Sequence, residues 1–166
     1  MKSTIYRSIA LTGLSLLLVW SPNVLAKELP HAAAYTKALV QCSSLLEETV
    51  EQLKTQNSKK GRKKGGLESE ESKTLGMQLL RKYGDTRLAI EEVIGKLEAM
   101  PEGEEGRKEM LDRCMGVWEI INQSRDLMLK AYEKPKDKKE VESYIQKLHL
   151  NMDALNAPRG KYRISD

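Results

Sequence analysis

Residues 35–53, with the sequence YTKALVQCSSLLEETVEQL, decide the fold class of this chain. Apolar or small residues recur in this stretch at alternating intervals of four and three, which is the spacing of the buried face of a bundle helix. The positions on that face are Tyr35, Leu39, Cys42, Leu46, Thr49 and Leu53. The pattern predicts a helix over residues 30–56, which Asn57, Ser58 and Gly61 would end.

The same periodicity occurs in three later segments and predicts helices over residues 69–100, 104–133 and 137–156. Ser69 and Asp137 stand where two of these helices begin, and both residue types are good N-caps. The composition agrees, because only 5% of the 166 residues are aromatic and none is Phe, whereas strands favour aromatic residues. We therefore predict an all-α fold, an antiparallel four-helix bundle with up-down-up-down connections.

The second helix carries one irregularity. The sequence Tyr83-Gly84-Asp85-Thr86 interrupts its apolar stripe. Glycine has a low helix propensity, and Asp85 could cap a new helix. We predict a single helix that is kinked at Gly84, and a complete break with a new start at Asp85 is the alternative.

The first 26 residues differ from the rest of the chain and predict a cleavable secretory signal peptide. Lys2 and Arg7 are followed by an apolar run over residues 9–20, and then by Pro22. As a helix this run would be about 18 Å long, which is short of the roughly 30 Å hydrocarbon core of a membrane. We therefore expect cleavage after Ala26, and an uncleaved membrane anchor is the less favoured alternative.

The rest of the chain divides into a bundle domain over residues 27–156 and a polar C-terminal tail over residues 157–166. No segment of this mature chain has the length and apolar composition of a membrane span. A signal peptide of this kind predicts that the protein is periplasmic or secreted.

The signatures of common enzyme and cofactor sites are absent from the sequence. It contains no Gly-Lys-Ser/Thr phosphate loop, no Cys-x-x-Cys pair and no His-Glu-x-x-His zinc motif. No nucleophile and base can be named as a set, and the chain is long enough to fold around a core without a cofactor. The sequence therefore predicts a protein without catalysis and without a cofactor.

Cys42 and Cys114 both fall on predicted buried faces. If the first and third helices point the same way, the two thiols lie at similar heights in the bundle. An oxidising compartment favours a disulfide between them, and we predict this bond. The first and third helices are diagonal in a square bundle, so the bond requires a flattened one. Two buried free thiols are the alternative.

The clearest surface feature is a basic run between the first two helices. It consists of Lys59, Lys60, Arg62, Lys63 and Lys64. In an up-down bundle the connection between the third and fourth helices lies at the same end and adds further basic residues, namely Lys134, Lys136, Lys138 and Lys139. The turn at the opposite end is acidic and contains Glu102, Glu104 and Glu105.

Such a basic pole could bind an anionic lipid surface, an anionic polysaccharide or an acidic protein. Nucleic acid is disfavoured as the partner, because no aromatic residues are interleaved with the basic ones for base stacking. A solvated, flexible loop without a partner is the alternative interpretation.

A second hypothesis concerns haem or metal binding. His31 begins the first helix, and His149 and Met152 lie near the end of the fourth. These two helix ends meet in an up-down bundle, and imidazole and thioether groups are ligands of haem iron and of copper. Two histidines at the surface, with Met152 as core filler, are the alternative.

The sequence therefore predicts an exported, non-catalytic helical protein that acts by binding another protein or an anionic surface. A haem- or metal-binding bundle that uses His31 and His149 is the alternative function. No particular partner and no oligomeric state follow from these patterns.

Overall fold

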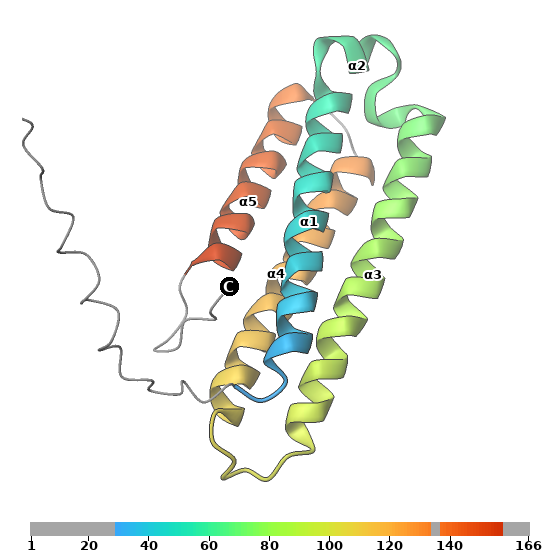
Figure 1. Ribbon diagram of the computed structural model, residues 1–166. Helices are drawn as coiled ribbons and strands as arrows, with labels where there is room; N and C mark the ends of the chain where they lie inside the picture. The colour runs from blue at the N-terminus through green and yellow to red at the C-terminus, as the bar shows by residue number, and fades with distance from the viewer. Residues whose placement is uncertain (1–28, 134–136, 158–166) are drawn as a thin grey trace, which may run out of the picture.

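The computed structural model describes residues 29–133 and 137–157, and the regular structure in these ranges is entirely helical (Figure 1). The body consists of four long helices, which are α1 (Ala32–Asn57), α3 (Glu70–Glu98), α4 (Arg107–Glu133) and α5 (Lys138–Asn156). A five-residue helix, α2 (Lys59–Lys63), and a 3-10 turn, η1 (Gly66–Glu68), join α1 to α3. The predicted all-α fold is confirmed, and α2 is an element that the sequence did not predict.

Several predicted features lie outside the described residues. They are the signal peptide over residues 1–26, residues 158–166 of the polar tail, and Lys134 and Lys136 of the basic pole. Among the helices in residues 29–133 and 137–157, none combines the length and the apolar composition that crossing a membrane requires.

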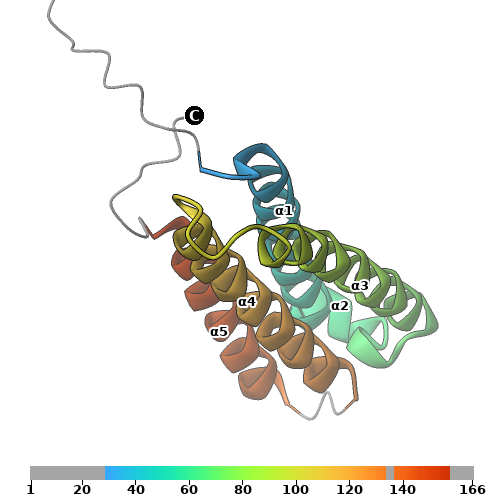
Figure 2. The same cartoon turned by 90° about the horizontal axis from the view of Figure 1, so that it is seen from below.

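The long helices lie side by side around an apolar core (Figures 1 and 2). α1 packs mainly against α3 and α5, and α4 packs mainly against the same two helices, so α1 and α4 are diagonal partners. Positions that the periodicity assigns to the core are fully buried, among them Leu46, Leu53, Ile90 and Leu148. Burying each such side chain contributes about 1.5–3 kcal/mol to stability, so these faces hold the helices together.

The ends of the helices follow local sequence signals. The Ser69 hydroxyl accepts a hydrogen bond from the Ser72 backbone N–H at 3.2 Å, and an Asp137 carboxylate oxygen accepts one from the Glu140 N–H at 2.8 Å. Both predicted N-caps are therefore confirmed. α3 runs without interruption through Gly84, so a break with a new start at Asp85 is wrong.

One polar contact inside the core ties α1 to α3. The hydroxyls of Thr49 and Tyr83 lie 3.0 Å apart, and the Thr49 hydroxyl also donates to the Leu45 carbonyl at 2.7 Å. Both side chains are fully buried, and burial raises the pKa of Tyr83. The contact satisfies two polar groups that would each be costly to bury alone.

The predicted disulfide between Cys42 and Cys114 is wrong. Both cysteines are free, and both are fully buried in the same apolar cluster. α1 and α4 do approach each other directly, so the absence of the bond does not follow from a square bundle that keeps these helices apart. The thiols instead pack as small apolar groups.

The buried thiols lead to a prediction about their reactivity. Burial raises the pKa of Cys42 from 9.0 to about 12 and that of Cys114 from 9.0 to about 11. Because the thiolate is the reactive form, we expect iodoacetamide at pH 8 to leave both thiols unmodified in the native protein. Intact mass should show both thiols alkylated once denaturant is added, without any reductant. Labelling in denaturant that requires prior reduction would contradict this.

The same pKa shifts set the response of stability to alkaline pH. The folded pKa values exceed those of the unfolded chain, so the unfolded chain loses its thiol protons first as the pH rises. The free energy of unfolding should therefore be unaffected by these groups below about pH 8.5 and should decrease between about pH 9 and pH 11. A Cys42→Ser/Cys114→Ser variant should show a shallower decrease.

Candidate functional site

The basic run is a structured element, because α2 packs directly against the C-terminal end of α1. Ser58 begins α2, and its hydroxyl accepts a hydrogen bond from the Gly61 N–H at 3.0 Å. A Cβ atom at Gly61 would approach the Gln56 carbonyl oxygen to 2.6 Å and the Thr55 carbonyl oxygen more closely still. Only glycine allows the two backbones to come this close, so Gly61 fixes the position of α2 on α1.

Asn57 connects three elements at this end of the molecule. Its side-chain oxygen accepts a hydrogen bond from Arg62 Nε at 3.0 Å, and its side-chain nitrogen donates to the Lys138 carbonyl at 3.0 Å. The Asn57 side chain is buried, which makes these bonds more valuable than surface ones. Asn57 thus holds the end of α1, the basic helix α2 and the start of α5 together.

The connection between α2 and α3 is anchored to the apolar core by one side chain. Leu67, in η1, is 4% exposed and belongs to the apolar cluster formed at this end of α1, α4 and α5. α2 therefore packs closely on α1 at Gly61 and is held there by the hydrogen bond between Arg62 and Asn57, and the segment after it is anchored by the buried Leu67. The interpretation of this run as a flexible loop is not supported by these contacts.

The positive charges of this end all face solvent. The exposed side chains of α2 and of the residue after it, together with two at the start of α5, form a surface that we name the basic cap: Lys59, Lys60, Arg62, Lys63, Lys64, Lys138 and Lys139. The Asn57–Lys138 bond brings the two groups to the same end of the molecule, as predicted for the lysines of α5 that the structure describes.

Acidic side chains border the basic cap but neutralise little of it. Lys138 Nζ lies 3.4 Å from a Glu142 carboxylate oxygen in an exposed ion pair, and such pairs contribute little. Among the described residues, no ion pair engages Lys59, Lys60, Lys63 or Lys64. Four cations on and next to α2 are therefore available to an anionic partner.

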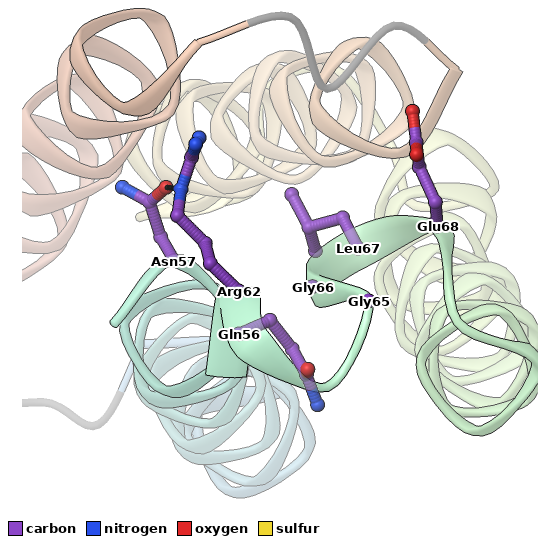
Figure 3. A pocket seen from close by; sticks show the side chains of 7 residues that line it. All are labelled: Gln56, Asn57, Arg62, Gly65, Gly66, Leu67 and Glu68. Atoms are coloured by element: carbon purple, nitrogen blue, oxygen red, sulfur yellow. Dashed lines mark hydrogen bonds between the residues drawn. The ribbon is translucent and has the colours of Figure 1, made fainter. Parts of the chain in front are cut away.

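A hollow of about 270 Å³ lies beside α2 (Figure 3). Arg62 and Asn57 stand on one side of it, and Glu68 stands apart on the other (Figure 3). The Arg62 Nε donates a hydrogen bond to the Asn57 side-chain oxygen, and the two terminal NH₂ groups of the guanidinium make no hydrogen bond to any residue that the structure describes. This arrangement can present a fixed guanidinium to a phosphate, sulfate or carboxylate group.

The residues of the haem or metal hypothesis are placed differently. His31 is exposed at the start of α1, where it has a positive φ of 58°, and His149 is half-buried on α5. Met152 is half-buried and packs against both apolar clusters. Within the described ranges, no three His, Cys, Asp or Glu side chains gather in a way that could hold a metal ion.

The residues that position the basic cap were not identified from the sequence. The sequence pattern predicts only that Asn57, Ser58 and Gly61 end the first helix. Ser58 belongs to the residue types that favour N-caps, and this is a local signal for the start of α2. The hydrogen bond from Asn57 to the Lys138 carbonyl joins residues 81 positions apart, and no local sequence pattern predicts it.

Comparisons with protein-family models, with curated proteins and with solved structures find no match for this chain.

Proposed function

We propose that the protein is an exported, non-catalytic binding protein that uses the basic cap to hold an anionic partner, either an acidic protein or an anionic surface. The observation that carries this proposal is the attachment of α2. Its cations project from a short helix that Ser58, Gly61 and Asn57 fix to α1. Export is supported by the signal-peptide pattern of residues 1–26.

Fixing the charges matters energetically. Binding immobilises flexible side chains and loops at a cost of about 0.5–1.5 kcal/mol for each long side chain, and a segment that is already ordered avoids part of the backbone cost. A disordered lysine-rich loop would attract anions at long range but would have to be ordered on contact. α2 presents Lys59, Lys60 and Lys63 on a backbone that is already in place.

We also infer an up-down-up-down path for the four long helices. This path places the basic cap and the acidic turn at opposite ends of the molecule. The packing of α1 with α3, of α3 with α4, of α4 with α5 and of α5 with α1 supports this path. Exposed Glu102, Glu104 and Glu105 lie in the connection between α3 and α4, at the end opposite α2 (Figure 1). The field of the acidic turn then orients the molecule with its basic cap toward an anionic surface.

A bend of α3 at Gly84 belongs to the same proposal. The Thr86 hydroxyl donates to the Lys82 carbonyl at 2.9 Å, and such bonds to the preceding turn often bend a helix. Gly84 has nothing within 4 Å of the position where a Cβ would stand, so the core does not require glycine there. The bend would curve α3 around the core.

Vesicles of defined charge test the proposal. The purified chain should co-sediment with phosphatidylglycerol vesicles and not with phosphatidylcholine vesicles at low salt, and the binding should fall steeply as the ionic strength approaches about 0.15 M. Binding to a soluble sulfated polysaccharide alone would support the basic cap and assign a polysaccharide partner. Binding that is equal for both vesicle types, or that is independent of salt, would contradict the proposal.

A further inference from the structure

One cation of the basic cap differs from the others, because a buried side chain holds it in place. Arg62 Nε donates a hydrogen bond to the Asn57 side-chain oxygen at 3.0 Å, and Asn57 is only 5% exposed. Asn57 is in turn tied to the start of α5 through the Lys138 carbonyl. None of the lysines of α2 forms an ion pair within the part of the chain that the structure describes. The basic cap therefore contains one guanidinium whose position is fixed.

The hydrogen bond to Asn57 leaves the outer edge of the Arg62 guanidinium available. The bond uses Nε, and neither terminal NH₂ group bonds to any residue in the described ranges. The two terminal groups can donate two parallel hydrogen bonds, which match two oxygens of one anionic group. A lysine ammonium is a point charge and does not offer this fork. Arg62 can thus select an anion by its geometry, whereas the lysines attract anions by charge alone.

Two glycines keep the space beside Arg62 open. Gly65 and Gly66 line the same hollow of about 270 Å³, which has room for several water molecules and so for a phosphate group. Both have positive φ, 97° and 56°, a conformation that favours glycine. A Cβ at Gly66 would stand 3.8 Å from Arg62 Cγ and 3.6 Å from the Gln56 carbonyl oxygen. It would occupy the part of the hollow next to the Arg62 side chain.

The charges around the hollow have opposite signs on its two sides. In the view of Figure 3, Leu67 stands between Arg62 on one side and Glu68 on the other. Lys63 and Lys64 follow Arg62 directly in the sequence and add positive charge next to it. An anionic group is therefore attracted to the Arg62 side of the hollow and repelled from the Glu68 side.

The number of free oxygens and the charge distinguish the anions that this side can receive. A carboxylate or a phosphodiester has two oxygens to share and a single negative charge, and the guanidinium fork would use both oxygens. A phosphomonoester has three terminal oxygens and a charge of about −1.5 to −2 at pH 7. Its third oxygen and its additional charge are matched by the ammonium groups of Lys63 and Lys64.

We propose that the hollow beside α2 binds a phosphomonoester group and that Arg62 is the residue that selects it. The terminal NH₂ groups of Arg62 hold two phosphate oxygens, and Lys63 and Lys64 neutralise the remaining charge. The group belongs either to a lipid headgroup, as in phosphatidic acid, or to a soluble phosphorylated molecule. This inference rests on the proposed function, because it names the anion that the basic cap receives.

Vesicles with two headgroups test the lipid source. Phosphatidic acid presents a phosphomonoester and phosphatidylglycerol a phosphodiester, and the share of each in phosphatidylcholine vesicles is set so that their surface charges are equal. The full chain should bind the phosphatidic acid vesicles at least about fivefold more tightly. Arg62→Lys keeps the charge but removes the fork, and it should reduce this preference to less than about twofold.

Arg81→Lys is the matched control, because Arg81 is exposed on α3 and lies outside the basic cap. This variant should keep the wild-type preference for phosphatidic acid over phosphatidylglycerol. Circular dichroism would establish that both variants are folded under the binding conditions. An Arg62→Lys variant with the wild-type preference would overturn the proposal, and so would a wild-type protein without any preference.

Glucose 6-phosphate and glucose 6-sulfate test the soluble source, since both have three terminal oxygens but the sulfate ester has a single charge. In an NMR titration of the wild-type protein, the side-chain N–H signals of Arg62 should shift with glucose 6-phosphate at lower concentrations than with glucose 6-sulfate. This measurement needs no variant. Arg62 signals that respond to neither glucose 6-phosphate nor phosphatidic acid vesicles would overturn the proposal, and so would equal responses to the two sugar esters.

The two sets of probes identify the source of the phosphate. A preference for phosphatidic acid without binding of glucose 6-phosphate would assign a lipid headgroup, and the reverse result would assign a soluble ligand. Failure of the proposed function would appear differently, as binding to phosphatidylglycerol vesicles that is no stronger than binding to phosphatidylcholine or does not depend on salt. Failure of the present inference would appear in the ratio of affinities within each pair of probes.

Discussion

Replacing Gly61 with alanine is expected to weaken binding to phosphatidylglycerol vesicles about tenfold, although it removes no charge. The added Cβ would lie within 2.6 Å of the Gln56 carbonyl oxygen, so α2 has to move away from α1 or unwind. The cations of α2 would then have to be ordered when they bind. We also expect the free energy of unfolding to decrease by about 1–3 kcal/mol, which is the usual cost of overpacking.

Gly95→Ala is the matched control for this substitution. Gly95 lies within α3 and has nothing within 4 Å of the position of a Cβ. Alanine there should stabilise the helix by about 0.5–1 kcal/mol and leave vesicle binding unchanged. Circular dichroism would establish that both variants are folded under the binding conditions. Wild-type stability and affinity in the Gly61→Ala variant would show that α2 does not depend on its close approach to α1.

The second large effect is expected in the core, where Thr49 and Tyr83 share a hydrogen bond between α1 and α3. Thr49→Val should leave the Tyr83 hydroxyl buried without a partner, at a cost of about 1–3 kcal/mol. Tyr83→Phe should cost less, because the Thr49 hydroxyl keeps its bond to the Leu45 carbonyl. Denaturant unfolding measures both changes in the free energy of unfolding.

The double variant decides whether the two hydroxyls act together. Thr49→Val combined with Tyr83→Phe removes both polar groups and should be less destabilised than the sum of the single variants. Strict additivity would mean that the two side chains do not interact, and it would contradict the packing of α1 against α3 at this level.

The long helices could be predicted from the sequence because their signals are local and repeated. The four-and-three spacing around Leu46 and Leu53 needs no knowledge of the partner helix to indicate a buried face. The caps at Ser69 and Asp137 depend on residues only three positions away, so they too were identified correctly.

The features that could not be predicted depend on contacts between distant parts of the chain. An isolated five-residue helix has no stability of its own, and α2 exists because α1 lies against Gly61 and because Leu67 is buried. The disulfide prediction rested on the expected compartment and on equal heights of Cys42 and Cys114. It failed because neither the compartment nor equal height fixes how two side chains are oriented within a packed core, where both thiols are buried and free.

Two charge-matched variants test the central claim, that the basic cap and not the overall charge binds the anionic partner. The cap variant replaces Lys60, Lys63 and Lys64 with Gln, and the control variant replaces three exposed basic residues elsewhere with Gln, namely Arg81, Lys108 and Lys147. Both variants lose three positive charges. In both, the free energy of unfolding should stay within about 0.5 kcal/mol of the wild-type value.

The decisive measurement is the dissociation constant of each variant for phosphatidylglycerol vesicles at low salt. We predict that the cap variant binds at least about tenfold more weakly than the wild type, and that the control variant stays within about twofold of it. Equal weakening of the two variants would contradict the account, because binding would then depend on net charge alone and not on the cations that α2 holds in place.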